Sequence, residues 1–245
     1  DNAKNILMDE MRKRSIVTRY IITSNKKPTT QKVRIIAHSQ QLIRVDYEKR
    51  EEDKKTQNTI LTIIKKEIGG VDAVIVSDYS KGILNKEVIK EAIKLANTNN
   101  KIIVIDPKQK DCEPYKNATL ITPNNKEAAL MINQEPKNDD ASINKIGKEL
   151  MEKTKSNILI TRGEKGMSLF EKNGKITHIP TKAKEVYDVT GAGDTVVAAA
   201  ALALTSGATM KEAAEIANHA AGITVGKVGT TTVSVEELKK DLTST

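Results

Sequence analysis

Aromatic side chains and cysteine are scarce in this chain of 245 residues. It contains one phenylalanine, five tyrosines and no tryptophan, so isoleucine, leucine, valine and alanine must supply most of its core. The single cysteine, Cys112, excludes internal disulfides and favours a reducing compartment, so we expect a cytoplasmic protein. The only histidines, His38, His178 and His219, lie far apart in the sequence, which argues against a structural zinc site.

Long hydrophobic runs are absent as well. The longest run, Val196–Leu204, is rich in alanine and is much shorter than the roughly 20 apolar residues that span a bilayer. The opening residues, Asp1–Glu10, are polar and acidic, unlike a signal peptide. We therefore expect no association with a membrane.

Acidic residues are outnumbered by basic ones, 32 to 40, which gives a formal net charge of +8. Such a balance is compatible with nucleic-acid binding. However, the lysines alternate with acidic residues instead of forming a basic stripe, and aromatic side chains that could stack on bases are few. We expect a solvated, lysine-rich surface and no nucleic-acid partner.

Short apolar runs alternate with helical patterns through the middle of the chain. Ala73–Ser77 is a continuous apolar run, which predicts a strand that is buried on both faces. Further strands are predicted at Lys101–Asp106, Thr119–Thr122 and Asn157–Thr161, and amphipathic helices at Asn85–Asn97 and Ala141–Lys153. This alternation predicts an α/β fold with a mostly parallel sheet that is covered by helices.

Two hairpins interrupt this alternation. The half-exposed strands predicted at Lys32–Ala37 and Leu42–Asp46 flank a polar connection, His38–Gln41, and we expect them to lie outside the main sheet. The turn Lys172-Asn173-Gly174, with its Asn-Gly pair, predicts a second hairpin between strands at Ser168–Glu171 and Lys175–Ile179.

Helical patterns occupy both ends of the chain. Near the C-terminus, helices are predicted at Asp194–Leu204, at Met210–Val225 and near Val235–Leu242. The first stretch, Asp1–Arg14, is also helical in character, whereas a parallel α/β domain usually opens with a strand.

The segment Asp188-Val-Thr-Gly-Ala-Gly-Asp-Thr195 is the most informative one for function. Gly191 and Gly193 precede a helix that we expect to open near Asp194, and backbone N–H groups at such a position bind anions. A carboxylate beside a bound phosphate is costly unless it accepts a proton from an attacking hydroxyl. A dinucleotide fingerprint is excluded because Val196 stands at its third glycine position, and no P-loop occurs. An ordinary glycine-containing helix cap is the alternative interpretation.

Polar side chains also follow the predicted strands. Asp78 and Asp106 end two of them, and the loop Thr161-Arg-Gly-Glu-Lys-Gly166 follows a third. The carboxyl ends of parallel strands meet at one edge of the sheet, where open α/β folds bind ligands. Asn124 and Glu127 follow the strand that ends at Thr122 and could organise a hydrated magnesium ion, although the same spacing also fits a helix cap.

A resemblance to a known family narrows this interpretation. Thr190-Gly-Ala-Gly-Asp194 resembles the signature of the ribokinase-like (PfkB) carbohydrate kinases. Other segments resemble one branch, the D-glycero-β-D-manno-heptose 7-phosphate kinases of the HldE/RfaE type. In chain order they are Lys32-Val-Arg34, Gln40-Gln-Leu-Ile-Arg-Val-Asp46, Ser77-Asp-Tyr-Ser-Lys-Gly82, Ile105-Asp-Pro-Lys108, Thr122-Pro-Asn124, Glu185-Val-Tyr-Asp-Val-Thr190 and Gly226-Lys-Val-Gly-Thr230.

The resemblance implies a ribokinase-like fold and transfer of phosphate from ATP to the anomeric hydroxyl of heptose 7-phosphate. The product, the 1,7-bisphosphate, is a precursor of ADP-heptose for the lipopolysaccharide core. Magnesium is implied, and a monovalent cation near the anion hole is left open. Asp194 would be the catalytic base. The anion hole would be formed by the backbone amides of Gly191, Ala192 and Gly193.

The resemblance also implies two binding surfaces. The nucleotide would contact Asn124, Glu127, Thr161, Gly163, Gly166 and Asn218, with Glu127 also near the magnesium. The hairpin 32–46 would form part of a lid over the sugar, and such lids often pair into homodimers. Lys32, Arg34 and Lys81 are candidates for holding the 7-phosphate, or are solvated charges. His219 is assigned to helix packing.

Two departures from the family pattern concern its ends. Members open with a strand and a Gly-Gly-x-x-Asn-type segment that hold the sugar hydroxyls, and nothing of that kind precedes Asp1. The cytidylyltransferase-like domain of the bifunctional form is also absent. We therefore expect one kinase domain, residues 1–245, without its N-terminal part, and with apolar surface exposed where the first strand would pack.

Three alternatives to this function stay open. The first is another ribokinase-like kinase with a different sugar. The second is a non-catalytic homologue that binds nucleotide. The third is a split enzyme that is completed by a separate chain.

Overall fold

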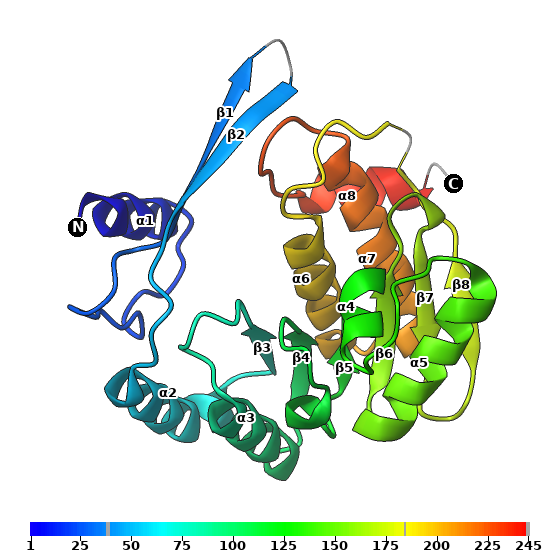
Figure 1. The fold of residues 1–245 in the computed structure, drawn as a ribbon, viewed down its shortest axis with the longest axis horizontal. Helices are drawn as coiled ribbons and strands as arrows, with labels where there is room; N and C mark the ends of the chain where they lie inside the picture. The colour runs from blue at the N-terminus through cyan, green and yellow to red at the C-terminus, as the bar shows by residue number, and fades with distance from the viewer. Residues whose placement is uncertain (38–39, 184, 244–245) are drawn as a thin grey trace.

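The main sheet of the protein has six strands in sequence order. The structure is a computed structural model that describes residues 1–37, 40–183 and 185–243. The strands are β3 (Ala73–Ser77), β4 (Ile102–Asp106), β5 (Leu120–Ile121), β6 (Asn157–Thr161), β7 (Met167–Phe170) and β8 (Ile176–Ile179). Strands β3 to β6 are parallel, and β7 and β8 continue the sheet as an antiparallel hairpin (Figure 1). The predicted fold class is confirmed.

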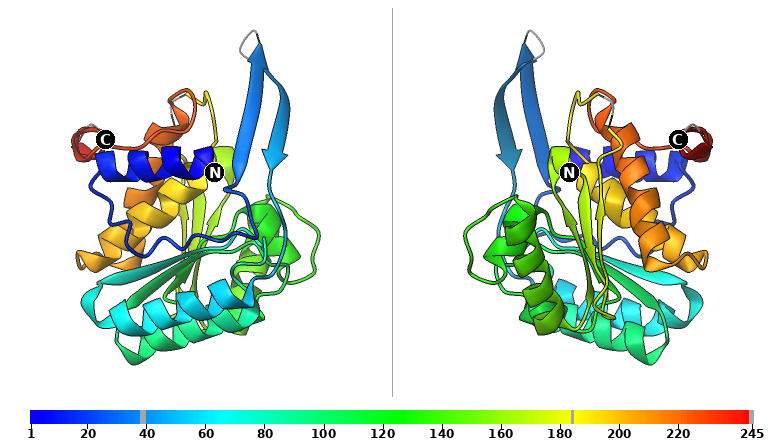
Figure 2. Two further views of the ribbon diagram at one scale, coloured as in Figure 1. Left: turned by 90° about the vertical axis from the view of Figure 1, so that its left-hand side faces the viewer. Right: turned by 90° about the vertical axis from the view of Figure 1, so that its right-hand side faces the viewer.

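Helices cover both faces of this sheet (Figure 2). On one face lie α2 (Lys54–Glu67), α3 (Lys86–Thr98), α4 (Asn125–Leu130) and α5 (Asp140–Thr154); on the other lie α6 (Ala192–Thr205) and α7 (Met210–Val225). Each face has its own apolar core, because successive strand residues point to opposite sides of a sheet. Ile103 and Ile105 of β4 pack toward α3 and α5, whereas Val104 packs toward α6.

The predicted helix Asn85–Asn97 shows how closely periodicity anticipates burial. Asn85 caps α3 by accepting a hydrogen bond from the N–H of Val88 at 2.9 Å, and the helix then runs to Thr98. All five of its predicted core residues are buried: Val88, Ile89, Ala92, Ile93 and Ala96. No element was predicted for α2, which Asp53 caps by accepting from the N–H of Thr56.

Strand β3 corrects one expectation. Its bounds are those predicted, but it is an edge strand and is not buried on both faces. Val76 is 6% exposed and packs toward α3, whereas the side chain of Ile75, on the opposite face, is 47% exposed. A continuous apolar run predicts burial only where neighbouring elements cover both faces of the strand.

The hairpin near the N-terminus forms a separate two-stranded sheet, β1 (Gln31–Ala37) and β2 (Gln40–Tyr47), which projects from the body of the protein (Figure 1). Both strands extend further than predicted, and residues 38 and 39 of the predicted connection lie outside the described residues. Lys32 pairs with Asp46 and Arg34 with Arg44 on one face. The other face is apolar and exposed at Val33, Ile35, Ile43 and Tyr47.

Two further helices lie near the ends of the chain. The opening stretch forms α1 (Asn2–Lys13), as predicted, and the last helix is α8 (Val235–Thr243). Helix α6 begins at Ala192, two residues before the predicted start, so Gly193 belongs to its first turn. In the described ranges 1–37, 40–183 and 185–243, every helix is too short or too polar to cross a membrane.

Candidate active site

The first turn of α6 forms the centre of the candidate site. Gly191 caps the helix in the left-handed conformation, with φ +85°, and Ala192, Gly193 and Asp194 follow as its first three residues. The first N–H groups of a helix lack acceptors within the helix, and the helix dipole makes this end positive. A methyl group placed on Gly193 would meet no other atom within 4 Å, so the space beside this turn is open.

The three predicted anion-hole amides are not equivalent. The N–H of Ala192 donates to the carbonyl of Val189 at 3.3 Å, so this group is already engaged. Gly191 and Gly193 provide the backbone that an anion can approach closely, because neither carries a side chain. The alternative of an ordinary helix cap therefore describes the backbone correctly, and it leaves room for a ligand.

Asp194 lines a cavity of about 960 Å³ together with all three predicted cations, Lys32, Arg34 and Lys81. Residues from five parts of the chain thus meet here: helix α1, strand β1 with the residues just before it, the end of β3 with the loop after it, the first turn of α6 and the loop before α8. A carboxylate that faces several cations in a cavity of this size can meet an anionic substrate that carries a hydroxyl.

Two of these cations also interact with acidic groups, one through an ion pair and one through its charge at longer range. The ammonium of Lys81 forms an ion pair with Glu48, which follows the hairpin. Arg34 lies within electrostatic reach of Asp188, the acidic residue that opens the glycine segment. The pKa of the Asp188 carboxyl is lowered first by hydrogen bonds from Thr190 and also by the nearby positive charge of Arg34. The hairpin is therefore linked electrostatically to the α6 turn.

Tyr79 is the residue of this cavity that sequence reasoning missed. Its hydroxyl donates to Oδ1 of Asp194 at 3.4 Å, and its ring lies 5.6 Å from Nζ of Lys32 and 5.9 Å from Nζ of Lys81. The preceding residue, Asp78, anchors the loop because it accepts hydrogen bonds from the N–H of Ser80 and from the hydroxyl of Tyr115. In the sequence, Tyr79 was indicated only as a member of the segment Ser77–Gly82, which resembles the family.

A second cavity, of about 470 Å³, lies on the other side of the same helix turn. Four predicted nucleotide contacts line it: Thr161, Gly163, Gly166 and Asn218. Ala192 and Gly193 form its border with the turn, and apolar side chains complete its wall: Met167, Val186, Val189, Val196 and Val225. A wall of this kind suits a flat apolar ring, while the glycine loop offers backbone groups to polar atoms.

Asn218 and the loop glycines have distinct local roles. Asn218 is buried, with 3% exposure, and its side-chain amide donates to the carbonyl of Pro180 at 2.7 Å. Gly166 has φ +75°, and a methyl group there would meet the carbonyl oxygen of Ile179 at 2.1 Å. Gly163 has φ +62° with open space beside it. Gly166 therefore closes the turn, whereas Gly163 leaves room at the cavity.

Asn124 and Glu127 form the helix cap that was the alternative interpretation. The side chain of Asn124 accepts from the N–H of Glu127 at 2.9 Å, and Oε2 of Glu127 accepts from the N–H of Asn124 at 2.9 Å. Neither residue is among those lining the two cavities described above. Asn124 nevertheless pairs with Thr161 through a parallel bridge, so this cap adjoins the glycine loop Thr161–Gly166.

A network of charges continues from Glu127 toward Asp194. The ammonium of Lys108 donates to Oε1 of Glu127 at 2.6 Å and to Oδ1 of Asp106 at 3.2 Å. Burial raises the pKa of the Asp106 carboxyl to about 6, against the opposing effect of Lys108, and the charges of Glu127 and Asp194 add to the rise. Asp106 therefore lies within electrostatic reach of Asp194.

These residues fit a hydrated magnesium ion better than a metal held by side chains alone. The described residues contain no group of three or more His, Cys, Asp or Glu arranged to hold a metal. Both oxygens of Glu127 already accept hydrogen bonds, so Glu127 would meet a metal through water. Magnesium keeps several waters and takes its other ligands from phosphates, which agrees with one or two carboxylates at this edge.

His219 is placed as predicted, in helix packing. The residue is buried on α7, with 7% exposure, and Nδ1 lies 2.6 Å from Oδ2 of Asp241 on α8. The pair fastens the last helix of the described chain to the helix that carries Asn218.

Known proteins resemble the chain in sequence and in fold. The family described as "pfkB family carbohydrate kinase" matches residues 1–238. Over 242 residues the chain is 41% identical to the bifunctional protein HldE of a Nitratiruptor species, which covers 98% of this chain and 51% of that protein. The chain thus spans about half the length of the curated relatives it matches.

Solved structures of low sequence identity show the same fold. A ribokinase from Thermotoga maritima matches with a TM-score of 0.78 at 23% identity, over 99% of this chain and 78% of its own. Phosphofructokinase-2 from Escherichia coli in complex with potassium matches with a TM-score of 0.68 at 16% identity, over 82% of this chain and 66% of its own. The fold of the chain is therefore ribokinase-like.

Proposed function

The chain belongs to the pfkB family of carbohydrate kinases, which use ATP, and we propose that it phosphorylates the anomeric hydroxyl of D-glycero-β-D-manno-heptose 7-phosphate. The observation that carries the proposal is the meeting of two cavities at one helix turn: Asp194 and three cations face the first, and the glycine loop faces the second. The identity to HldE and the HldE-like segments quoted above support the choice of sugar.

In the proposed reaction, Asp194 accepts the proton of the anomeric hydroxyl. The sugar oxygen then forms a bond to the γ-phosphorus, and the bond from that phosphorus to the β–γ bridging oxygen breaks, which releases ADP. The open first turn of α6 would stabilise the charge on the γ-phosphoryl oxygens through its backbone N–H groups. Since these groups are fixed before the substrate arrives, little reorganisation is needed.

The second cavity would hold the nucleotide. Its apolar wall would receive the adenine near Asn218, and Thr161, Gly163 and Gly166 would lie along the ribose and phosphates. When bound, magnesium would neutralise charge on the triphosphate, and Glu127, next to Asp106 and Lys108, is the residue we expect to hold its water shell.

A monovalent cation is an additional proposal. It is supported by the potassium complex of the phosphofructokinase-2 neighbour and by the acidic residue that lies close to the α6 cap in this chain. Asp188, beside the cap of α6, would be the residue that attracts such an ion.

The hairpin supplies a lid and a contact surface. Lys32 and Arg34 of β1 reach the cavity of Asp194 from one face, whereas Val33, Ile35 and Ile43 expose the other face to solvent. We propose that this apolar face pairs with the hairpin of a second copy. The product, the 1,7-bisphosphate, would enter ADP-heptose and lipopolysaccharide synthesis in the cytoplasm.

The deciding experiment measures ADP release with magnesium and ATP in the presence of heptose 7-phosphate, unphosphorylated heptose, ribose or fructose 6-phosphate. We expect the highest kcat/KM with heptose 7-phosphate. A higher value with another sugar would replace the proposed substrate with that sugar. Binding of ATP without turnover of any sugar would favour a non-catalytic homologue, or a site completed by another chain.

A further inference from the structure

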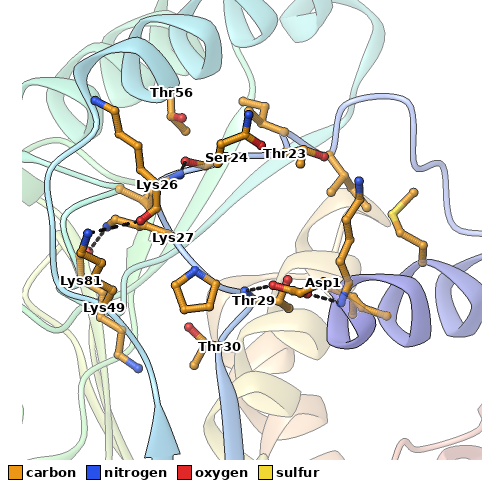
Figure 3. A pocket seen from close by; sticks show the side chains of 18 of the residues that line it. Asp1, Thr23, Ser24, Lys26, Lys27, Thr29, Thr30, Lys49, Thr56 and Lys81 are labelled. Atoms are coloured by element: carbon orange, nitrogen blue, oxygen red, sulfur yellow. Dashed lines mark hydrogen bonds between the residues drawn. The ribbon is translucent and has the colours of Figure 1, made fainter.

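Figure 3 shows a third cavity, of about 970 Å³. It adjoins the cavity of Asp194. It lies between α1, the segment 20–30 and the start of α2. The two cavities have five lining residues in common: Leu7, Thr29, Thr30, Lys81 and Ile83. They therefore form one continuous groove, with the predicted catalytic base at one end and the third cavity, which we call the outer cavity, at the other.

Lysines gather at one side of the outer cavity. Figure 3 shows Lys26, Lys27, Lys49 and Lys81 together, on the side away from Asp1. The acidic side chains nearby are already engaged. Glu48 pairs with Lys81, and Oε2 of Glu51 lies 2.6 Å from Nζ of Lys49.

Asp53 is engaged as well. Its Oδ2 accepts hydrogen bonds from the hydroxyls of Ser24, at 3.1 Å, and Thr56, at 2.9 Å. The carboxylates of Glu48, Glu51 and Asp53 thus have partners other than Lys27.

Lys27 differs from the other lysines in how its ammonium is held. The residue is half-buried, and Nζ donates to the backbone carbonyl of Lys81 at 2.7 Å. Among the described residues, no carboxylate lies within ion-pair distance of this ammonium; Glu51 feels its charge but pairs with Lys49. A half-buried ammonium that has a carbonyl but no carboxylate partner can take an anion from outside as its counter-ion.

A series of contacts along the groove connects Asp194, the predicted base, with the ammonium of Lys27. The hydroxyl of Tyr79 lies 3.4 Å from Asp194, and its ring lies 5.9 Å from Nζ of Lys81. The carbonyl of Lys81 in turn holds Lys27. A ligand with a reactive hydroxyl at one end and a negative group at the other would match this order of groups.

We propose that Lys27 forms the core of a phosphomonoester subsite in the outer cavity, which holds the phosphate of the acceptor sugar. This inference rests on the proposed function, because it places the 7-phosphate of the heptose there. Lys81, at the junction of the two cavities, would assist Lys27. Lys32 and Arg34, which lie near Tyr79 and Asp188, would face the reacting end of the sugar instead.

The test compares Lys27→Met, which keeps the apolar stem and removes the charge, with Lys27→Arg, which keeps the charge. Lys55→Met, at an exposed position of α2 that does not line the groove, is the matched control. For Lys27→Met we expect the KM of the phosphorylated sugar to rise between about tenfold and a hundredfold, as for loss of a charged hydrogen bond. The KM of ATP, and kcat/KM for unphosphorylated heptose, should stay unchanged. Lys27→Arg should restore part of the affinity.

A second measurement needs no turnover. Acetylation of Lys27 is followed by mass spectrometry with and without inorganic phosphate, and we expect phosphate to protect Lys27 but not Lys55. Protection together with the KM effect supports a subsite for the acceptor. Protection without a KM effect would indicate a site for free phosphate and would overturn the proposal, as would the absence of protection.

The two proposals can fail separately. If the chain prefers a different phosphorylated sugar, and Lys27→Met raises its KM, the subsite stands and the heptose assignment falls. If heptose 7-phosphate is the substrate and Lys27→Met leaves its KM unchanged, the heptose assignment stands and the subsite falls. If no sugar is turned over, the subsite stands only if heptose 7-phosphate protects Lys27 from acetylation more strongly than inorganic phosphate does; equal protection would indicate a site for free phosphate and would overturn it.

Discussion

The hydroxyl of Tyr79 donates to Oδ1 of Asp194 across 3.4 Å, although the two residues are separated by 115 positions in the sequence. The loop after β3 and the first turn of α6 therefore meet at the predicted catalytic base. Hydrogen bonds in an empty catalytic site are often long and shorten when substrate binds. We therefore predict that Tyr79 positions the carboxylate of Asp194.

Replacing Tyr79 with phenylalanine should lower kcat by about threefold to tenfold, because the carboxylate loses one donor while the ring stays in place. The KM of ATP should not change, since the nucleotide cavity lies on the other side of α6. Steady-state kinetics with both substrates measure the effect. Tyr187→Phe is the control, because it removes a similar contact, to Glu185 at 2.6 Å, from an exposed loop. Equal kinetics for the two variants would exclude a positioning role for Tyr79.

Replacing Asp194 with asparagine should abolish turnover and leave ATP binding intact. The amide has nearly the shape of the carboxylate but cannot accept the proton, and loss of a general base typically costs about 10²–10⁴-fold in rate. Calorimetric titration with ATP and an assay of ADP release test the two halves of the prediction. Turnover close to that of the unaltered chain would remove Asp194 from its assigned role.

Replacing Gly193 with alanine should weaken ATP binding without lowering the melting temperature. The added methyl group meets no atom of the chain, but it enters the open space beside the first turn of α6. Thermal unfolding with and without nucleotide separates the two effects. Gly69→Ala, which also has open space beside it and lies far along the chain from the site, is the control. In contrast, Gly166→Ala should destabilise the fold, because the methyl group would collide with the backbone of Ile179.

The buried carboxyl of Asp106 should make stability depend on pH. Its pKa rises from the ordinary 3.8 to about 6 in the folded chain, so the folded state binds the proton more tightly than the unfolded state. The free energy of unfolding should therefore decrease as the pH rises from about 4 to about 6, by up to about 3 kcal/mol from this group, and should level off at higher pH. Asp106→Asn should remove this component. Urea denaturation at a series of pH values would show it, and identical profiles for the two chains would contradict it.

Local sequence patterns anticipated the elements whose burial follows a simple period. The five apolar positions of α3 repeat at helical spacing, and all five are buried. The exposure of Ile75 could not be predicted from the local pattern of apolar residues, since it depends on which elements cover an edge strand. Helix α2 was missed because charged and polar residues dominate its first turns, Lys54–Asn58, and dilute the apolar period.

The sequence also predicted part of the candidate site, but not all of it. The glycines and Asp194 of α6 form a recognisable local pattern, and the structure places them at one helix start. The contact between Tyr79 and Asp194 joins distant segments and leaves no local trace. Asn124 and Glu127 show the opposite difficulty: one spacing fits both a helix cap and a magnesium site, and the structure directly shows only the cap.

The first turn of α6 lies between two cavities, and the residues that line them come from different parts of the sequence. The cavity of Asp194 is lined mostly by residues between Leu7 and Leu84, whereas the nucleotide cavity is lined by residues between Thr161 and Val225. Under the proposed function, recognition of the acceptor and recognition of the donor would therefore be encoded in separate stretches of sequence that meet at the start of α6. A chimaera that receives residues 1–84 from a relative with another sugar should exchange its acceptor and keep its phosphoryl donor.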